Sequence, residues 1–274
     1  MSNDDTDPLD PSGIAQFIQH DRCRRYLKQR VDPGDEPEAR EWTEAFSAMN
    51  AGLLGEGQEF EAIQIEALAA NAARIIGPEL EATGKAGVPE IDIDETWAES
   101  TAGRRRQLQE AAEAARQLST DGEPSYILCY QAPLGGQLGA ESVWGEADCL
   151  VFAPAQAEEI DVVARVLEIK SATEQQRAHR VQVAIYSALL DEIFGETDGY
   201  RIETSVLTRP DAAAAGESLD PFAVPTFSRE KWVVFAEGLL AADGPVESAL
   251  TDDLEELPFA LDQVCNNCAY REAC

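Results

Sequence analysis

The sequence has few basic residues, and this shortage limits how the protein can bind its partners. Its 274 residues include 21 Lys and Arg against 52 Asp and Glu, so the formal net charge is −31. Only four of the basic residues are lysines, at positions 28, 85, 170 and 231. The deficit excludes a uniformly basic nucleic-acid-binding surface. Any nucleic-acid site must therefore be a local exception to the overall charge.

The acidic residues are spread along the whole chain rather than gathered in one tail. An acidic, lysine-poor globular chain resembles the proteins of extreme halophiles, which work in molar salt. At about 1 M salt the Debye length is about 3 Å, so repulsion between surface carboxylates is largely screened. We therefore expect a halophilic protein, and an acidic protein that repels nucleic acid is the competing interpretation.

The sequence also lacks the long apolar runs that cross membranes. No stretch contains 18 or more apolar residues, and the N-terminus MSNDDTDPLDP has neither the basic nor the apolar region of a signal peptide. We therefore expect a cytoplasmic protein. In that compartment, six cysteines indicate a metal or cluster site rather than disulfides.

Two apolar runs carry acidic residues that are spaced for a metal site. Asp148 opens the run 149–152, and Glu168-Ile169-Lys170 ends the run that starts at 162. Side chains alternate between the two faces of a strand, so Glu168 and Lys170 share one face. If the runs pair as antiparallel strands, Asp148 meets Glu168 at one end of the sheet. Such oxygen ligands suit Mg²⁺ or Mn²⁺, although two amphipathic strands with solvated charges are the simpler alternative.

A helix after these strands favours the metal-site interpretation. Residues 173–194 have the apolar period of a helix, with Gln182 and Tyr186 at positions i and i+4. The ordered set Gly145, Asp148, Glu168, Lys170, Gln182 and Tyr186 resembles the PD-(D/E)XK nuclease superfamily in its RecB-like branch. That resemblance implies that Asp148, Glu168 and the Ile169 carbonyl bind the metal. It also implies that Lys170 orients the nucleophile while Gln182 and Tyr186 support the site.

The arrangement of apolar segments predicts an α/β fold with a helical first half and a mixed sheet later. We expect a disordered acidic tail (1–11), a helical part (12–120), a nuclease core (121–245) and a cysteine-bearing tail (246–274). Ser12 is the predicted N-cap of the first helix. Helices are predicted at 13–29, 38–76, 94–118, 173–194 and 229–241, and strands at 126–132, 149–152, 162–167, 202–208 and 224–227.

Three cysteines near the C-terminus, Cys265, Cys268 and Cys274, form a C-x2-C-x5-C pattern. Three thiolates alone cannot complete a tetrahedral zinc site or a cubane cluster, so a fourth ligand is needed. The pattern resembles the iron–sulfur members of the RecB-like nucleases, including CRISPR-associated exonucleases and AddB-type domains, which carry one cysteine before the core and three after it. The resemblance implies a 4Fe-4S cluster on Cys23, Cys265, Cys268 and Cys274 that clips the chain ends together. A structural zinc is the alternative.

Many of these relatives place a metal-binding histidine after a glycine on the helix before the core. The two histidines of this chain, His20 and His179, do not occupy that context. Glu61, in the segment GQEFE at 57–61, stands in the matching place. The resemblance therefore implies that Glu61 is the substitute metal ligand, and a solvated helix glutamate is the alternative.

Arginines gather at 22–25, 104–106 and 177–180. Because arginine makes bidentate contacts to phosphate, four of them are candidate DNA contacts: Arg24, Arg25, Arg177 and Arg180. An exposed helix flank is the alternative, which we favour for 104–106. At molar salt counterion release supplies little affinity, so base stacking would have to contribute. The candidate aromatic residues are Tyr26, Tyr130, Trp144 and Tyr186.

These features together predict a metal-dependent deoxyribonuclease that hydrolyses phosphodiester bonds. Single-stranded DNA as the substrate, exonuclease action, a place in DNA repair, recombination or defence, and a helicase or CRISPR partner are implied by the resemblance alone. A non-catalytic DNA-binding or assembly subunit is one alternative, against which the intact Asp148, Glu168 and Lys170 argue. The nuclease fragment of a helicase–nuclease is another. The chain has no Walker A motif, so it is not itself a motor.

Overall fold

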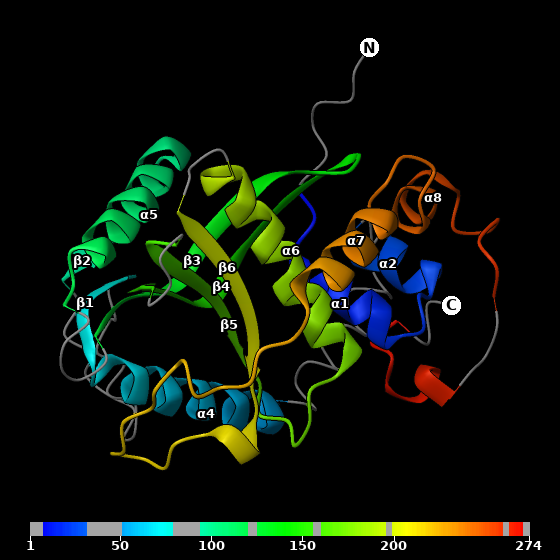
Figure 1. Ribbon diagram of the computed structural model, residues 1–274. Helices are drawn as coiled ribbons and strands as arrows, with labels where there is room; N and C mark the ends of the chain where they lie inside the picture. The colour runs from blue at the N-terminus through cyan, green and yellow to red at the C-terminus, as the bar shows by residue number, and fades with distance from the viewer. Residues whose placement is uncertain are drawn as a thin grey trace.

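The computed structural model describes residues 8–31, 51–78, 94–119, 125–155, 160–195, 199–259 and 263–270. A mixed six-stranded sheet lies at its centre, in the order β2-β1-β3-β4-β5-β6. Its strands are β1 (Ala72–Gly77), β2 (Glu95–Thr96), β3 (Tyr126–Leu138), β4 (Glu141–Pro154), β5 (Val162–Ile169) and β6 (Tyr200–Leu207). Helices pack on both faces of this sheet (Figure 1), which confirms the predicted α/β class.

The sheet has a hydrophobic core on each face, and each core is covered by its own set of helices. On one face lie α5 (Thr101–Arg116) and α6 (Arg177–Phe194), and α1 (Pro11–Gln19) packs against α6. The other face is covered by α4 (Ala51–Ala69) and by the segment 213–224. Apolar side chains are buried around most of the circumference of α6, as expected for a helix enclosed by the sheet and other helices. This central helix therefore has a fixed position over the strands.

The hairpin of β3 and β4 changes face halfway along its length. Ala147 and Leu150 both point into the core beneath α6. They are three positions apart, whereas residues on one face of a regular strand are two apart. Across from Asp148 in the register lies Gln131, whose φ of 44° is left-handed. Because regular strands keep one face at every second residue, this break changes the direction of both side chains. It lies where the pairing of β4 with β5 ends.

The N-terminal segment forms two short helices, so the prediction of one helix at 13–29 is wrong. The side chain of Asp10 accepts a hydrogen bond from the Ser12 amide (2.8 Å), which makes Asp10 rather than Ser12 the N-cap. Pro11 occupies the first helical position, where its missing N–H costs nothing. Asp21 and Arg22 adopt left-handed φ angles of 52° and 59° and separate α1 from α2 (Arg24–Val31).

Residues 8–10 precede α1 and already belong to the fold. Leu9 is 5% exposed, its amide donates to the Ser142 carbonyl (2.8 Å), and it forms a parallel bridge with Val143. The expected disordered tail therefore does not extend to residues 8–11. Residues 1–7 lie outside the described part of the chain.

The predicted long helix at 38–76 is wrong at its C-terminal end, where β1 begins at residue 72. Ile75 and Ile76 are both buried and face the two opposite cores. A β-branched pair of this kind suits a strand with both faces covered. The helix predicted at 94–118 starts at Thr101, after the N-cap Ser100, because residues 95–96 form β2. Residues before 121 therefore supply two of the six strands.

The C-terminal helices lie beside the two N-terminal helices α1 and α2 (Figure 1). α7 (Arg229–Leu239) packs against α6, and α8 (Pro245–Thr251) packs against α2. The ring of Tyr270 lies 5.5 Å from that of Tyr26, centroid to centroid. The predicted strand at 224–227 is wrong, because this segment makes only a single bridge, between Ser205 and Thr226. Among the described helices, none has the length and apolar character needed to cross a bilayer.

Candidate active site

The end of β5 holds a carboxylate with no exposure to solvent. Glu168 lies on the face of β5 that α6 covers, and its side chain is 0% exposed. Its Oε1 accepts hydrogen bonds from Lys170 Nζ (2.6 Å) and Gln182 Nε2 (2.5 Å). Its Oε2 is buried and has no hydrogen-bond partner within the described residues. Because an unpaired buried carboxylate oxygen is costly, this atom is a place where a bound cation would stabilise the fold.

Asp148 lies beside Glu168 because the register of β4 and β5 brings the two strands together there. The ladder pairs Cys149 with Leu167, and Asp148 and Glu168 are the next residues on each strand. Past this point Asp148 Oδ2 accepts the amide N–H of Ile169 (2.7 Å) in place of a backbone carbonyl. The side chain is 16% exposed, so it can be reached from solvent. The kink at residue 148 thus places a carboxylate where the strands separate.

Lys170 places an ammonium group between these two carboxylates. Its Nζ lies 2.6 Å from Glu168 Oε1 and 3.8 Å from Asp148 Oδ2. Burial alone would lower the pKa of this group, but the charges of Glu168 and Asp148 outweigh burial and raise the pKa above its ordinary value. Lys170 therefore stays protonated near neutral pH and acts as a hydrogen-bond donor.

Gln182 and Tyr186 of α6 support the site in two different ways. Gln182 Nε2 bridges Glu168 Oε1 and the hydroxyl of Ser12 (3.1 Å), so it connects the strand to α1. Tyr186 instead donates its hydroxyl hydrogen bond to the carbonyl of Glu146 (2.8 Å). A Cβ atom on Gly145 would lie 3.0 Å from that hydroxyl oxygen, so the tyrosine requires a glycine at this position. Tyr186 therefore holds the β4 backbone two residues before Asp148.

Glu61 of α4 faces the same space from the other side of the site. Burial, and next the charge of Asp148, raise the pKa of Glu61 to about 7, while Lys170 acts in the opposite direction. The same leading causes, burial and then Asp148, raise the pKa of Glu168. A nearby like charge disfavours ionisation, so Glu61 and Glu168 both lie near Asp148. The structure thus brings together Glu61, Asp148, Glu168 and Lys170.

These carboxylates can be tested for their fit to a divalent cation. Within the described ranges, no three His, Cys, Asp or Glu side chains are arranged to hold a metal ion as they stand. Asp148 Oδ2 and Glu168 Oε1 accept hydrogen bonds from protein donors. The chemistry nevertheless fits, because all donors are hard oxygens and one buried carboxylate oxygen of Glu168 is unpaired. Mg²⁺ and Mn²⁺ are the cations that this set suits.

The cysteines of the predicted cluster lie partly within the described chain. The pKa of Cys268 is raised by burial and also by Cys23 and Cys265, so the fold brings these thiols into one region, although among the described residues they are not arranged to hold a metal ion as they stand. Cys23 and Cys268 are partly buried against the main core. Cys274 lies outside the described residues. The fold therefore brings residue 23 to the C-terminal segment, as a shared cluster would require.

The arginines predicted to bind DNA fall into different surroundings. Arg25 Nε donates to the Leu257 carbonyl (3.1 Å), and its guanidinium lies over Phe259, so this side chain holds the C-terminal segment. Arg24 is half-buried at the start of α2, and Arg177 is exposed at the start of α6. The guanidinium of Arg180 lies over the rings of Phe227 and Trp232, 5.8 Å from each ring centroid. DNA contact by these residues stays a prediction.

Two neighbours of the site, Ser12 and His179, are not among the site residues predicted from the sequence. Ser12 contacts Gln182 across 170 positions of sequence, and no local pattern could have identified it. Burial, and next the charge of Lys170, lower the pKa of His179 to about 4. The neutral imidazole accepts the Gln176 amide N–H at Nδ1 (3.3 Å). This leaves a ring N–H near Lys170 as a further donor.

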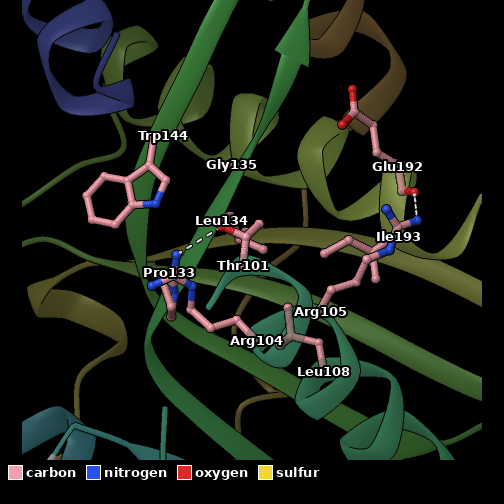
Figure 2. Close-up of a pocket in the computed structure, with 10 residues that line it drawn as sticks. All are labelled: Thr101, Arg104, Arg105, Leu108, Pro133, Leu134, Gly135, Trp144, Glu192 and Ile193. Carbon is pink, nitrogen blue, oxygen red and sulfur yellow. Dashed lines mark hydrogen bonds between the residues drawn. The ribbon is translucent and has the colours of Figure 1, made fainter. Parts of the chain in front are cut away.

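A small pocket lies away from these carboxylates, between α5, β3, β4 and the end of α6 (Figure 2). Figure 2 shows Arg105 bound to the Glu192 carbonyl and Arg104 bound to Thr101, so both arginines are held by the protein itself. The cavity volume is about 60 Å³, well below the roughly 300 Å³ at which small-molecule sites begin. This supports the interpretation of 104–106 as a helix flank.

Comparison with known proteins was made for the whole chain. No protein-family model matches it, and no curated protein matches it. Among solved structures, the chain is similar to a crystal structure from Eubacterium rectale described as a "Putative exonuclease". The two share 11% sequence identity and superpose with a TM-score of 0.34, over 92% of this chain and 88% of that chain. At this level of similarity, the function has to be argued from the site itself.

Proposed function

We propose that the protein is a metal-dependent nuclease of the PD-(D/E)XK type, in the RecB-like branch, that hydrolyses phosphodiester bonds in DNA. The observation that carries this proposal is the meeting of Asp148, Glu168 and Lys170 where two strands separate. Glu168 is fully buried, while Asp148 and Lys170 are 16% and 28% exposed, so two acids and an ammonium group meet in a mostly buried place that solvent can reach. The unpaired Glu168 oxygen supports the proposal, because a bound cation would give this atom a partner.

Asp148, Glu168 and Glu61 would hold the divalent cation, together with the backbone carbonyl of Ile169. A cation bound there lowers the pKa of water and offsets the charge that builds up on a phosphate. Glu61 belongs to this set because its pKa responds to both Asp148 and Lys170. Its carboxylate oxygen would take the ligand position that a histidine nitrogen occupies in relatives of this type.

Lys170 acts on the reacting phosphate or on the attacking water as a hydrogen-bond donor, because its raised pKa keeps it charged. Gln182 holds the Glu168 carboxylate in place, and its second contact to Ser12 fixes the orientation of the amide. Tyr186 fixes the backbone on which Asp148 stands. Positioning of this kind matters because misplacing a reacting group by about 1 Å costs on the order of a hundredfold in rate.

The cysteines support a second part of the proposal, a 4Fe-4S cluster on Cys23, Cys265, Cys268 and Cys274. The nearness of Cys23 and Cys265 to Cys268, which raises the pKa of Cys268 beyond the effect of burial, supports it. Linking residue 23 to residues 265–274 closes a loop of about 240 residues, and the entropy gained from closure grows slowly with loop length. The cluster would therefore hold α2 against the C-terminal segment rather than take part in the hydrolysis.

A cleavage assay tests the proposed function. The purified protein in about 2 M KCl with Mn²⁺ should degrade a 5′-labelled single-stranded oligonucleotide, and EDTA should stop the reaction. Asp148→Asn and Glu168→Gln should each lower the rate at least a hundredfold, a loss of about 2.7 kcal/mol of transition-state stabilisation. Glu66→Gln is the matched control, because Glu66 is an exposed carboxylate of α4, the helix that carries Glu61.

Cleavage that persists in excess EDTA would contradict the metal mechanism. Full activity of Asp148→Asn and Glu168→Gln would remove these residues from the active site. If the wild-type protein binds the oligonucleotide but does not cleave it with any divalent cation, a non-catalytic DNA-binding role replaces the nuclease.

A further inference from the structure

An open groove along α7 is lined by basic side chains, although the chain as a whole is acidic. Its volume is about 670 Å³, and its lining includes Arg22, Arg177 and Lys231 and, among the residues that the structure describes, no carboxylate. In a chain with 52 acidic and 21 basic residues, three cations without an acid is a local exception to the composition. All three side chains are exposed. The groove is therefore available to an anionic partner.

Aromatic side chains line the same groove. The indole of Trp232 lies 6.0 Å from the ring of Phe235, edge to face, and both are partly buried against the main core. Lys231 Nζ lies 5.3 Å from the Trp232 ring centroid, and Arg180 Cζ lies 5.8 Å from it. The core contacts hold the indole rigidly, while the exposed Lys231 can move to a phosphate when a base covers the ring.

The groove begins close to the candidate active site. Arg177 is the first residue of α6, and Gln182, which binds Glu168, follows five residues later on the same helix. At about 1.5 Å per residue the two lie roughly 7.5 Å apart along the helix axis. The groove and the residue that holds Glu168 are therefore both placed by the N-terminal part of α6.

We propose that this groove binds single-stranded nucleic acid next to the bond that is cleaved. This inference rests on the proposed function, because it names the path of that function's substrate. A base stacks on Trp232, and neighbouring phosphates contact Lys231, Arg177 and Arg22. The volume lies within the roughly 300–1,000 Å³ of sites that enclose small molecules, enough for one or two nucleotides. A duplex does not fit this chemistry, because its bases are stacked on one another and cannot stack on Trp232.

Binding without cleavage tests the groove. A fluorescently labelled 15-mer of thymidine is titrated with the full chain in EDTA, by anisotropy, from about 0.2 to 2 M KCl. Trp232→Ala should weaken binding at least fivefold at every salt concentration, as expected for a lost stacking contact. Lys231→Gln should instead reduce the slope of log K against log salt by about 0.7, the contribution of one phosphate contact.

A third variant tests the groove without removing Trp232, which also packs against the main core. Val234 lines the groove and is 67% exposed, so Val234→Glu places a carboxylate there without disturbing the core. It should weaken binding at least tenfold. Trp144→Ala tests the rival stacking residue predicted from the sequence, a tryptophan that is 40% exposed on β4, and Arg106→Gln, at an exposed arginine of α5, is the matched control. Both should bind within twofold of the wild type.

The outcomes separate the groove from the nuclease. Wild-type affinity in Trp232→Ala and Val234→Glu would overturn the groove, and so would a loss in Trp144→Ala instead. A duplex 15-mer that binds as tightly as the single strand would overturn the stacking. No binding by the wild type, together with self-association that Val234→Glu abolishes, would reassign the groove to a second copy of the chain. If the groove variants lose binding but the wild type never cleaves with Mn²⁺, the groove stands and the proposed nuclease fails.

Discussion

Replacing Glu168 by glutamine should stabilise the metal-free protein. The buried carboxylate has one unpaired oxygen, and burial together with Asp148 raises its pKa from an ordinary value of 4.5 to about 8. At pH 7 the unfolded chain carries this group ionised, whereas burial and the charge of Asp148 make the ionised form unfavourable in the folded chain. About 2.5 pH units between 4.5 and 7, at about 1.36 kcal/mol per unit, give a folding cost on the order of 3 kcal/mol. Glutamine keeps an oxygen for Lys170 and Gln182 and removes that cost.

The sign of the pH dependence follows from the raised pKa. A carboxyl group whose pKa rises on folding does not reduce the stability of the fold below its unfolded pKa, near 4.5. The stability of the fold is lost as the pH rises from there through the folded pKa, about 8. The difference in unfolding free energy between Glu168→Gln and the wild type should therefore be small at pH 5 and grow to about 3 kcal/mol at pH 7. For a chain of this size that difference corresponds to roughly 5–10 °C in Tm.

Thermal melts in EDTA and about 2 M KCl, from pH 5 to pH 8, measure this difference. Comparison with Glu66→Gln removes the general effect of the acidic surface, because Glu66 is exposed. Adding Mn²⁺ at about 100 times its Kd should stabilise the wild type by about 2.7 kcal/mol and the Glu168→Gln variant far less. A variant that is less stable than the wild type at pH 7, or a difference that does not change with pH, would refute the reasoning.

Four further predictions concern other parts of the chain. Gly145→Ala should destabilise by about 1–3 kcal/mol in chemical denaturation, because the new Cβ would lie 2.6 Å from Pro11 Cδ and 3.0 Å from the Tyr186 hydroxyl; unchanged stability would contradict that packing. Cys23→Ser should lose bound iron by chemical analysis while the fully buried Cys129→Ser keeps it; the reverse result would reject the cluster assignment. Glu61→Gln should raise the Mn²⁺ concentration for half-maximal cleavage about tenfold, and an unchanged titration would make Glu61 a surface residue. The Tm should rise between about 0.1 and 2 M KCl as screening shortens the Debye length, and a Tm independent of salt would contradict the halophilic interpretation.

Local periodicity determined much of the fold and of the candidate site. Alternation along β5 places Glu168 and Lys170 on one face, and the 3.6-residue helical period places Gln182 and Tyr186 on one side of α6. Both relations depend only on neighbouring backbone geometry, so a single sequence is enough to predict them. The α/β class follows in the same way from the order of apolar segments, and the structure confirms it.

Tertiary structure decided the parts that depend on distant segments. Residues 72–77 could continue a helix, and they form β1 because β3 offers a strand partner. Ser12 meets Gln182, and Cys23 approaches Cys268, only because α1 and α2 pack beside α6 and the C-terminal segment. The kink at Gln131 and the basic lining of the groove along α7 likewise have no local pattern. Contacts across 100 or more residues depend on which surfaces bury each other best, and that choice is made by the packed chain as a whole.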